Sequence, residues 1–365
     1  MGSRLSTLLS ISLGVAVSAA AVAALGCAHV SRQGLDDGSP SAPSGGTYSL
    51  AASSARSTIY SSQTVSFALD RIDQRSLPLD RTYTHPATGK GVTVYVFDGG
   101  ISTTHPELSG RVRFGFTEFP DDQRICNPHG TAVAGAIAGT TLGVAPDAEI
   151  VDVKMVQCDK LRGTIKAIVD GAHWTIADHQ AHPGPAIANW SFIADTSARI
   201  PALDSAVREL RAAGIPVIVS AGNLDIDACR VSPGNSQGTI VVGASGVSAE
   251  RTENGAITTI DRRSPGTAFG PCIDLYAPGD SVLLPSLDRG MQPISQLWNG
   301  TSMSAGYVSG AAALFLETHR DATPDQVAEA LERNATVNVL RDTHAGSSKM
   351  LYVGAARPTV VAARP

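Results

Sequence analysis

The pattern that most constrains this 365-residue chain is an alternation of apolar runs and helical stretches from residue 91 onward. Short runs rich in Val and Ile are typical of buried strands, and small residues at helical spacing predict the helices between them. The expected strands cover residues 92–97, 149–153, 186–192, 215–220 and 239–243, and the expected helices cover residues 129–139, 161–178, 201–213 and 302–316. This alternation predicts a three-layer α/β fold with a mostly parallel sheet and helices on both faces.

Three polar residues stand where elements of this pattern begin or end. Asp98 follows a strand, His129 heads one helix, and Ser302 heads another within Asn-Gly-Thr-Ser-Met-Ser. Active groups of such folds gather at the carboxyl ends of the strands, and a helix N-terminus favours a developing anion. Each signal is weak when taken separately, because an Asp before Gly is commonly a turn residue. Together they predict a catalytic Asp, His and Ser.

The residues around these three positions resemble one family of enzymes. His129 begins His-Gly-Thr-Ala-Val-Ala-Gly, and residues 217–223 read Val-Ile-Val-Ser-Ala-Gly-Asn. With residues 69–74, 143–146 and 241–245, these segments resemble the subtilisin-like serine proteases, in particular the proteinase K branch and its thermostable secreted bacterial members. The order Asp, His, Ser along the chain is also the order of that family. The resemblance runs from about residue 67 to about residue 353 and implies the subtilisin-like fold.

The resemblance implies a serine endopeptidase that works through an acyl-enzyme intermediate. In this chemistry His129 takes the proton of the Ser302 hydroxyl and later delivers it to the leaving amine, while Asp98 holds the imidazole and stabilises its cation. Asn223 occupies the family's position for binding the oxyanion, beside the backbone N–H of Ser302. No cofactor is required for this chemistry, and polypeptides are the expected substrates.

A substrate peptide is expected to bind as an added strand, because a protease must extend the peptide to reach its carbonyl group. The residues expected to line its path are Ser191, Phe192, Ile193, Ser220, Ala221 and Gly222. Ile193 and Ala194 stand where relatives usually carry glycine, so side chains replace bare backbone there. We therefore expect a narrowed or reshaped pocket.

Other classes of function compete with this one. Departures beside the triad, such as Gly99 after Asp98 and Gly306 in place of the family's proline, leave open a catalytically impaired peptide-binding protein on the same fold. A nucleotide-binding enzyme would need a phosphate loop or a Gly-x-Gly-x-x-Gly turn after its first strand, and the sequence has neither. Lys and Arg number 28 against 33 Asp and Glu, a net charge of −5 that argues against nucleic acid as a partner.

The chain has five cysteines, at positions 27, 126, 158, 229 and 272. In an exported protein the last four predict two disulfides, for which three pairings are possible. Free thiols in a reducing compartment are the alternative. The family resemblance implies that Cys126 pairs with Cys158 and that Cys229 pairs with Cys272.

An acidic segment near the start of the matching region resembles a calcium loop of bacterial family members. Its oxygen donors, which are of the kind that Ca²⁺ prefers, are Asp70, Asp73, Gln74, Asp80 and Thr82. Such a calcium ion would be structural. A solvated acidic turn without a metal is the alternative interpretation.

The N-terminal residues have the layout of an export signal, because residues 8–26 carry no charge and follow Arg4. We expect a signal peptide or anchor over residues 1–30, a low-complexity linker or vestigial pro-segment over 31–62, the peptidase domain over 63–356 and a tail over 357–365. The protein is expected to be a secreted monomer. Membrane attachment is expected only if the N-terminal segment is retained or if Cys27 carries lipid.

Overall fold

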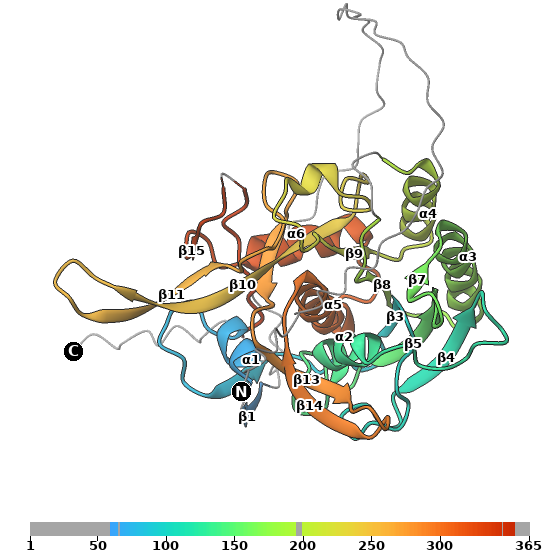
Figure 1. The fold of residues 1–365 in the computed structure, drawn as a ribbon, viewed down its shortest axis with the longest axis horizontal. Helices are drawn as coiled ribbons and strands as arrows, with labels where there is room; N and C mark the ends of the chain where they lie inside the picture. The colour runs from blue at the N-terminus through green and yellow to red at the C-terminus, as the bar shows by residue number, and fades with distance from the viewer. Residues whose placement is uncertain (1–58, 65, 195–198, 345, 355–365) are drawn as a thin grey trace, which may run out of the picture.

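The computed structural model describes residues 59–64, 66–194, 199–344 and 346–354. The expected export segment, most of the expected linker, Cys27 and the C-terminal tail lie outside these described residues. A nine-stranded sheet forms the middle layer of an α/β fold (Figure 1). Its parallel strands follow one another in the order β4 (Val112–Thr117), β5 (Glu149–Lys154), β3 (Thr93–Asp98), β8 (Ala186–Trp190), β9 (Val217–Ser220) and β10 (Ile240–Arg251).

Helices cover both faces of this sheet, as the sequence predicts. On one face α2 (His129–Ala138) and α5 (Thr301–Thr318) pack against each other, and α3 (Ile165–Ala181) and α4 (Pro201–Ala212) cover the other face. Each face has its own buried apolar core. The last helix, α6 (Pro324–Asn334), packs on α5 and begins at a capping box made by Thr323 and Gln326.

One predicted helix begins later than expected. The prediction of helix from residue 161 is wrong at its start, because Arg162–Gly163 forms β7 and pairs with β6 (Val156–Gln157). Thr164 then caps α3 by accepting the backbone N–H of Ala167 at 3.0 Å. The side-chain oxygen of a cap residue satisfies a helical N–H group that has no partner inside the helix, which fixes where the helix starts.

The sheet changes character at β10. β11 (Ile257–Arg263) pairs antiparallel with the outer part of β10, β15 (Leu340–Arg341) adds to β11, and β12 (Leu275–Pro278) pairs with the inner part. Figure 1 shows that the β10–β11 hairpin extends away from the body of the protein. Within this hairpin the sequence predicted only residues 239–243 as strand, because the outer part is largely exposed and carries no apolar run.

The first described elements are attached to this edge of the sheet. β1 (Tyr60–Gln63) pairs antiparallel with β2 (Thr82–His85), and α1 (Phe67–Ile72) lies between them in the chain. Arg71 is 1% exposed, and its Nε and Nη2 atoms donate to the two carboxylate oxygens of Asp261 at 2.7 and 2.9 Å. A buried arginine with both carboxylate bonds made holds α1 firmly against β11.

Two disulfides brace the loops of the structure. Cys126 is bonded to Cys158 with Cα atoms 4.5 Å apart, and Cys229 is bonded to Cys272 with Cα atoms 5.1 Å apart. These are the two pairs that the family resemblance implies. Since Cys126 lies shortly before His129, the first disulfide anchors the loop that leads into α2.

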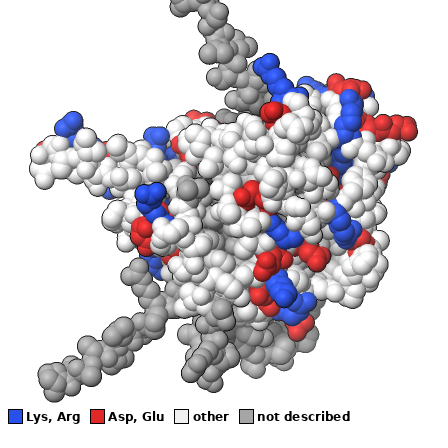
Figure 2. All heavy atoms as spheres, turned by 90° about the horizontal axis from the view of Figure 1, so that it is seen from below, with Lys and Arg blue, Asp and Glu red and all other residues white. Residues whose placement is uncertain are grey.

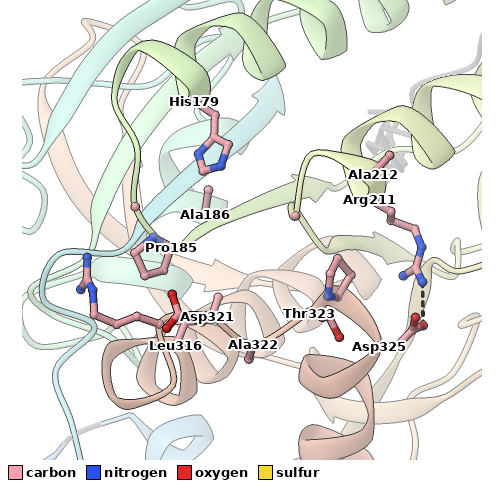
Figure 3. A pocket seen from close by; sticks show the side chains of 14 residues that line it. His179, Pro185, Ala186, Arg211, Ala212, Leu316, Asp321, Ala322, Thr323 and Asp325 are labelled. Atoms are coloured by element: carbon pink, nitrogen blue, oxygen red, sulfur yellow. Dashed lines mark hydrogen bonds and ion pairs between the residues drawn. The ribbon is translucent and has the colours of Figure 1, made fainter. Parts of the chain in front are cut away.

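A pocket of about 430 Å³ lies beside the start of β8 and the last turn of α5 (Figure 3). Ser302 is at the opposite end of α5. It is lined by Ala186 at the start of β8 and by Leu316 near the end of α5, and Arg211 beside it donates to Asp325 at 2.6 Å. The C-terminal ends of α3, α4 and α5 meet there, and arginine side chains stabilise such helix ends. None of the predicted catalytic residues lines this pocket, so it is separate from the site that the sequence predicts.

The surface carries charges of both signs. On the face seen in Figure 2, lysine and arginine side chains are interspersed with aspartate and glutamate. Among the residues that the structure describes, no helix is both long enough and apolar enough to cross a membrane.

Candidate active site

The fold brings the three predicted catalytic residues to one edge of the sheet. Asp98 is the last residue of β3, and the neighbouring strands β8 and β9 end at Trp190 and Ser220. The two helices of the same layer, α2 and α5, begin at this edge with His129 and Thr301. Two helix N-termini thus face the carboxyl ends of three adjacent parallel strands, which is where such folds place reactive groups.

Asp98 and His129 form a hydrogen-bonded pair. The Nδ1 atom of His129 lies 2.7 Å from Oδ2 of Asp98, and Oδ1 of Asp98 accepts the N–H of Gly99 at 2.7 Å. The Asp98 residue is 5% exposed, while the His129 side chain is 17% exposed. Burial lowers the pKa of His129, but the charge and the hydrogen bond of Asp98 outweigh it and hold that pKa above its ordinary value. With Nδ1–H given to the carboxylate, Nε2 is left as the basic nitrogen.

Gly130 permits the close approach of α2 to Asp98. A Cβ atom at residue 130 would lie 2.7 Å from the carbonyl oxygen of Gly100 and 3.0 Å from Cβ of Asp98. Neither neighbour can yield easily, because one is backbone and the other belongs to the triad. A larger residue would therefore push His129 away from its carboxylate partner.

Trp298, which the sequence analysis did not single out, packs against the imidazole. It ends β14 (Pro293–Trp298), whose hairpin with β13 (Val282–Leu287) lies on α2 and leads into α5. The Trp298 ring meets the His129 ring edge to face, with centroids 6.2 Å apart. The only signal in the sequence is the position of Trp298 immediately before Asn-Gly-Thr-Ser.

Ser302 is tied to the end of β8 by two reciprocal hydrogen bonds. Its hydroxyl donates to the carbonyl oxygen of Ser191 at 3.2 Å, and the Ser191 hydroxyl donates to the carbonyl oxygen of Ser302 at 3.1 Å. Ser302 is 8% exposed. Among the described residues no hydrogen bond joins Ser302 to His129, a looseness that is common in catalytic sites without substrate.

Asn223 is oriented by Thr301. Its Oδ1 atom accepts the N–H of Thr301 at 2.9 Å and the Thr301 hydroxyl at 3.1 Å. Because a backbone N–H can only donate, the oxygen must face Thr301, and the amide Nδ2 is left as a donor beside the start of α5. Thr301, a second residue that the sequence analysis did not assign a role, also accepts the N–H of Gly222 at 3.1 Å.

The residues predicted to bind substrate lie along two adjacent chain segments. Ser191, Phe192 and Ile193 follow β8, Ser220 ends β9, and Ala221 and Gly222 follow it. Phe192 stacks on Trp190 with ring centroids 5.5 Å apart and is 3% exposed, and Ala221 is fully buried. These two residues can offer a peptide only their backbone groups. Ile193 is partly exposed, so its side chain reaches the protein surface beside these two segments.

A buried carboxyl group lies on β5, the neighbour of β3. Asp152 is 5% exposed, and its Oδ2 atom accepts the N–H of Ile101 at 3.0 Å, in the turn that follows Asp98. Burial raises the pKa of Asp152 to about 7, and the charge of Asp98 adds to this effect. Asp152 was not identified from the sequence, because a single Asp in an apolar run carries no pattern.

Of the five residues predicted to hold calcium, Asp70 lies in α1, Thr82 begins β2, and Asp73, Gln74 and Asp80 lie on the loop between them. Burial raises the pKa of Asp73 to about 6, and the charges of Asp80 and Asp70 raise it further. The buried atoms Asp73 Oδ1 and Gln74 Oε1 have no hydrogen-bond partner. The two carboxylate oxygens of Asp70 each accept one backbone N–H, from Asp80 and Arg81, and each keeps a further lone pair. Within the described part of the chain, no three His, Cys, Asp or Glu side chains are grouped so as to hold a metal ion.

Known proteins resemble the chain over most of its described length. The model of the Subtilase family matches residues 89–352. The "Extracellular serine proteinase" of Thermus sp. (strain Rt41A) is 39% identical over 287 residues, which are 78% of this chain and 65% of that protein. The "Alkaline serine exoprotease A" of Vibrio alginolyticus is 37% identical over 289 residues, 78% of this chain and 50% of that protein. The chain thus spans between half and two thirds of the length of these relatives.

A solved structure is similar as well. The "Crystal structure of a cold adapted subtilisin-like serine proteinase" matches with a TM-score of 0.69 and 36% sequence identity. The match covers 81% of this chain and 100% of that one. The whole of that subtilisin-like chain is therefore matched by this one.

Proposed function

The chain belongs to the subtilase family, and from that premise we propose that it is a serine endopeptidase that hydrolyses polypeptides through Asp98, His129 and Ser302. The observation that carries the proposal is the hydrogen bond from His129 Nδ1 to Asp98, at the sheet edge where α5 begins with Thr301 and Ser302. That bond makes Nε2 the basic nitrogen of a histidine whose cation is stabilised. These are the two properties that a general base for a serine hydroxyl needs.

The reaction begins with the serine hydroxyl. When a peptide carbonyl group enters, Ser302 leaves its hydrogen bond with Ser191, gives its proton to His129 Nε2, and attacks the carbonyl carbon. The carbonyl oxygen becomes an oxyanion, which accepts hydrogen bonds from Asn223 Nδ2 and from the N–H of Ser302. His129 then protonates the leaving amine, and the peptide bond breaks to give the acyl-enzyme.

A water molecule completes the cycle. It takes the place of the amine, loses a proton to His129 Nε2, and attacks the ester carbonyl carbon. His129 returns the proton to Ser302 as the ester bond breaks. Asp98 stays ionised throughout and holds the imidazole in one orientation. This chemistry needs no cofactor, because the chain's own groups supply the nucleophile, the base and the oxyanion donors.

The direct test is digestion of an unfolded polypeptide such as casein, with the fragments identified by mass spectrometry. The native sequence is expected to release internal peptides, and Ser302→Ala is expected to release none above background. Binding of casein by both proteins without cleavage by either would instead support the peptide-binding protein that the departures around the triad leave open. Equal cleavage by both would show that another group is the nucleophile.

We also propose that the segment from Asp70 in α1 to Thr82 at the start of β2 binds a structural calcium ion. The support is its chemistry: two buried oxygens, of Asp73 and Gln74, lack partners, and three carboxylates lie close enough to disfavour one another's charge. A divalent cation with oxygen ligands would relieve both effects. Asp70, Asp73, Gln74, Asp80 and Thr82 are the residues that would hold it.

Calcium is therefore expected to raise the free energy of unfolding. At 100 times its dissociation constant the gain is about 2.7 kcal/mol, measured as a rise in Tm over a sample in EDTA. Asp73→Asn should abolish the rise, while Asp321→Asn, an exposed aspartate elsewhere, should leave it unchanged. A Tm that is the same with calcium and with EDTA would show that the loop is a solvated acidic turn.

The protein is further proposed to act outside the cytoplasm as a monomer. One relative is named as extracellular, and the disulfides Cys126–Cys158 and Cys229–Cys272 are of the kind that persists in oxidising compartments. The peptidase domain is proposed to cover residues 63–356. Membrane attachment depends on the fate of residues 1–30 and of Cys27, and intact mass of the exported protein would report both.

A further inference from the structure

We propose that the side chain of Ile193 fills the pocket for the substrate side chain on the acyl side of the scissile bond. The enzyme then accepts Gly, Ala or Ser there and rejects Phe, Tyr and Leu. This inference rests on the proposed function, because it places a peptide carbonyl group at Ser302. It concerns the side chain of the residue that donates that carbonyl group, here called the acyl-side residue.

The position of the pocket follows from the groups that hold the carbonyl. The carbonyl carbon must lie against Ser302 Oγ, with its oxygen toward Asn223 Nδ2. Ser302 is hydrogen-bonded to Ser191, and the adjoining Thr301 is hydrogen-bonded to Gly222. The start of α5 thus contacts both the segment that follows β8 and the segment that follows β9. The acyl-side residue is held at this point, and its side chain must enter between those two segments.

The space between the two segments is occupied by Ile193. Phe192 points into the core, where it stacks on Trp190. Ile193 instead lies against Gly222. A Cβ atom at residue 222 would lie 3.2 Å from Cγ2 and 3.3 Å from Cδ1 of Ile193, and 3.6 Å from Cγ1 of Val231. Even a methyl group at Gly222 would thus be in contact with Ile193.

The backbone around Ile193 is fixed on both sides. The N–H of Ala194 donates to the carbonyl oxygen of Ser232 at 2.8 Å, and the hydroxyl of Ser220 donates to the carbonyl oxygen of Phe192 at 3.4 Å. Ala194 and Val231 are each 2% exposed. A β-branched side chain also has few alternative rotamers. Ile193 therefore cannot retreat readily to admit a bulky substrate side chain, and selection by size follows.

The expected selectivity is measured with peptide anilides of the form acyl-Ala-Ala-Pro-Xaa, in which Xaa is Ala or Phe. The native enzyme should have the higher kcat/KM with Ala. Ile193→Gly should raise the ratio of kcat/KM for Phe over Ala by about 10- to 200-fold, the range that steric fit in an apolar pocket supplies. Ile193→Ala, which perturbs the backbone less, should raise it in the same direction. Ile257→Gly in the exposed β10–β11 hairpin is the matched control and should not change it.

A second measurement separates this inference from the proposed function, since it needs no catalysis. In the Ser302→Ala background, calorimetry compares binding of the product peptides acyl-Ala-Ala-Pro-Ala and acyl-Ala-Ala-Pro-Phe. The Ala peptide should bind more tightly, and adding Ile193→Gly should reverse the order. Tighter binding of the Phe peptide by protein that retains Ile193 would overturn the inference, even if the enzyme is an active protease. The predicted order without any cleavage by the native protein would support the inference and count against the proposed function.

Discussion

Replacing His129 with alanine is expected to lower kcat on a peptide substrate by about 10⁶-fold, the scale of loss when a serine protease loses its general base. Without Nε2 the Ser302 hydroxyl has no acceptor for its proton and is a poor nucleophile at neutral pH. KM should change little, because His129 is not needed for peptide binding. The measurement is steady-state kinetics with acyl-Ala-Ala-Pro-Ala anilide. The matched control is His173→Ala, because His173 is an exposed histidine that pairs with Glu209. This variant should retain full activity.

The pH dependence gives the same prediction a second readout. His129 must be neutral to accept a proton, and Asp98 holds its pKa above the ordinary value, so kcat/KM should rise with pH through an apparent pKa above about 6.5. Asp98→Asn removes the carboxylate charge and should move this apparent pKa downward while lowering kcat. An activity that does not change with pH across this range, or a His129→Ala variant of normal activity, would remove His129 from the mechanism.

Replacing Asn223 with alanine is expected to lower kcat by about 10²- to 10³-fold with little change in KM. The reason is that the Nδ2 donor meets a full negative charge only in the transition state, so its loss raises the barrier without weakening ground-state binding. Stopped-time assays of kcat and KM at pH 8 measure the effect. Thermal unfolding of the same samples checks that the loss does not come from instability.

Asn223→Asp is the sharper comparison, because the side chain keeps its shape. An Oδ1 atom can still accept from Thr301, but the donor is replaced by a second oxygen that would repel the oxyanion. This variant should therefore be at least as impaired as Asn223→Ala. If either variant instead raised KM with kcat intact, Asn223 would be a residue that binds substrate and not an oxyanion donor.

The main elements of the fold could be predicted because each has a local signal. The buried strand that ends at Asp98 is an apolar run, and α2 and α5 are marked by small residues that allow close helix packing. Asp98, His129 and Ser302 could be placed at the same edge because parallel strands present their carboxyl ends together. The sequence thus predicted where each of the three catalytic side chains lies in the fold, and the family resemblance indicated that they act together.

Long-range pairing accounts for what could not be predicted. The outer β10–β11 hairpin is held by hydrogen bonds between backbones and carries no apolar pattern, so only its buried beginning was recognised. The orientation of the Asn223 amide depends on Thr301, which is far away in the chain. Trp298 contacts His129, and Asp152 contacts Ile101, only because the fold brings these distant residues together. Such contacts have no signature in a single sequence.

The expected substrate-binding residues include one feature that could be predicted from the sequence and one that could not. The sequence predicted a narrowed or reshaped pocket, because Ile193 and Ala194 stand where relatives usually carry glycine. It could not predict which wall the Ile193 side chain would meet, since Gly222 and Val231 come from later parts of the chain. The structure adds that Ile193 lies 3.2 Å from where a Cβ atom of residue 222 would stand, and our proposal of selection for small side chains rests on this closeness.

Ser302 is proposed to be a nucleophile activated by His129, and covalent labelling of the folded protein by a fluorophosphonate tests this role most directly. Ser302 Oγ attacks phosphorus and displaces fluoride, His129 accepts the proton, and peptide mapping locates the added mass. We expect one phosphonylated residue, Ser302, and no label in Ser302→Ala or in the unfolded protein. A folded protein that stays unlabelled, or that carries the label elsewhere while Ser302 is unmodified, would contradict that role.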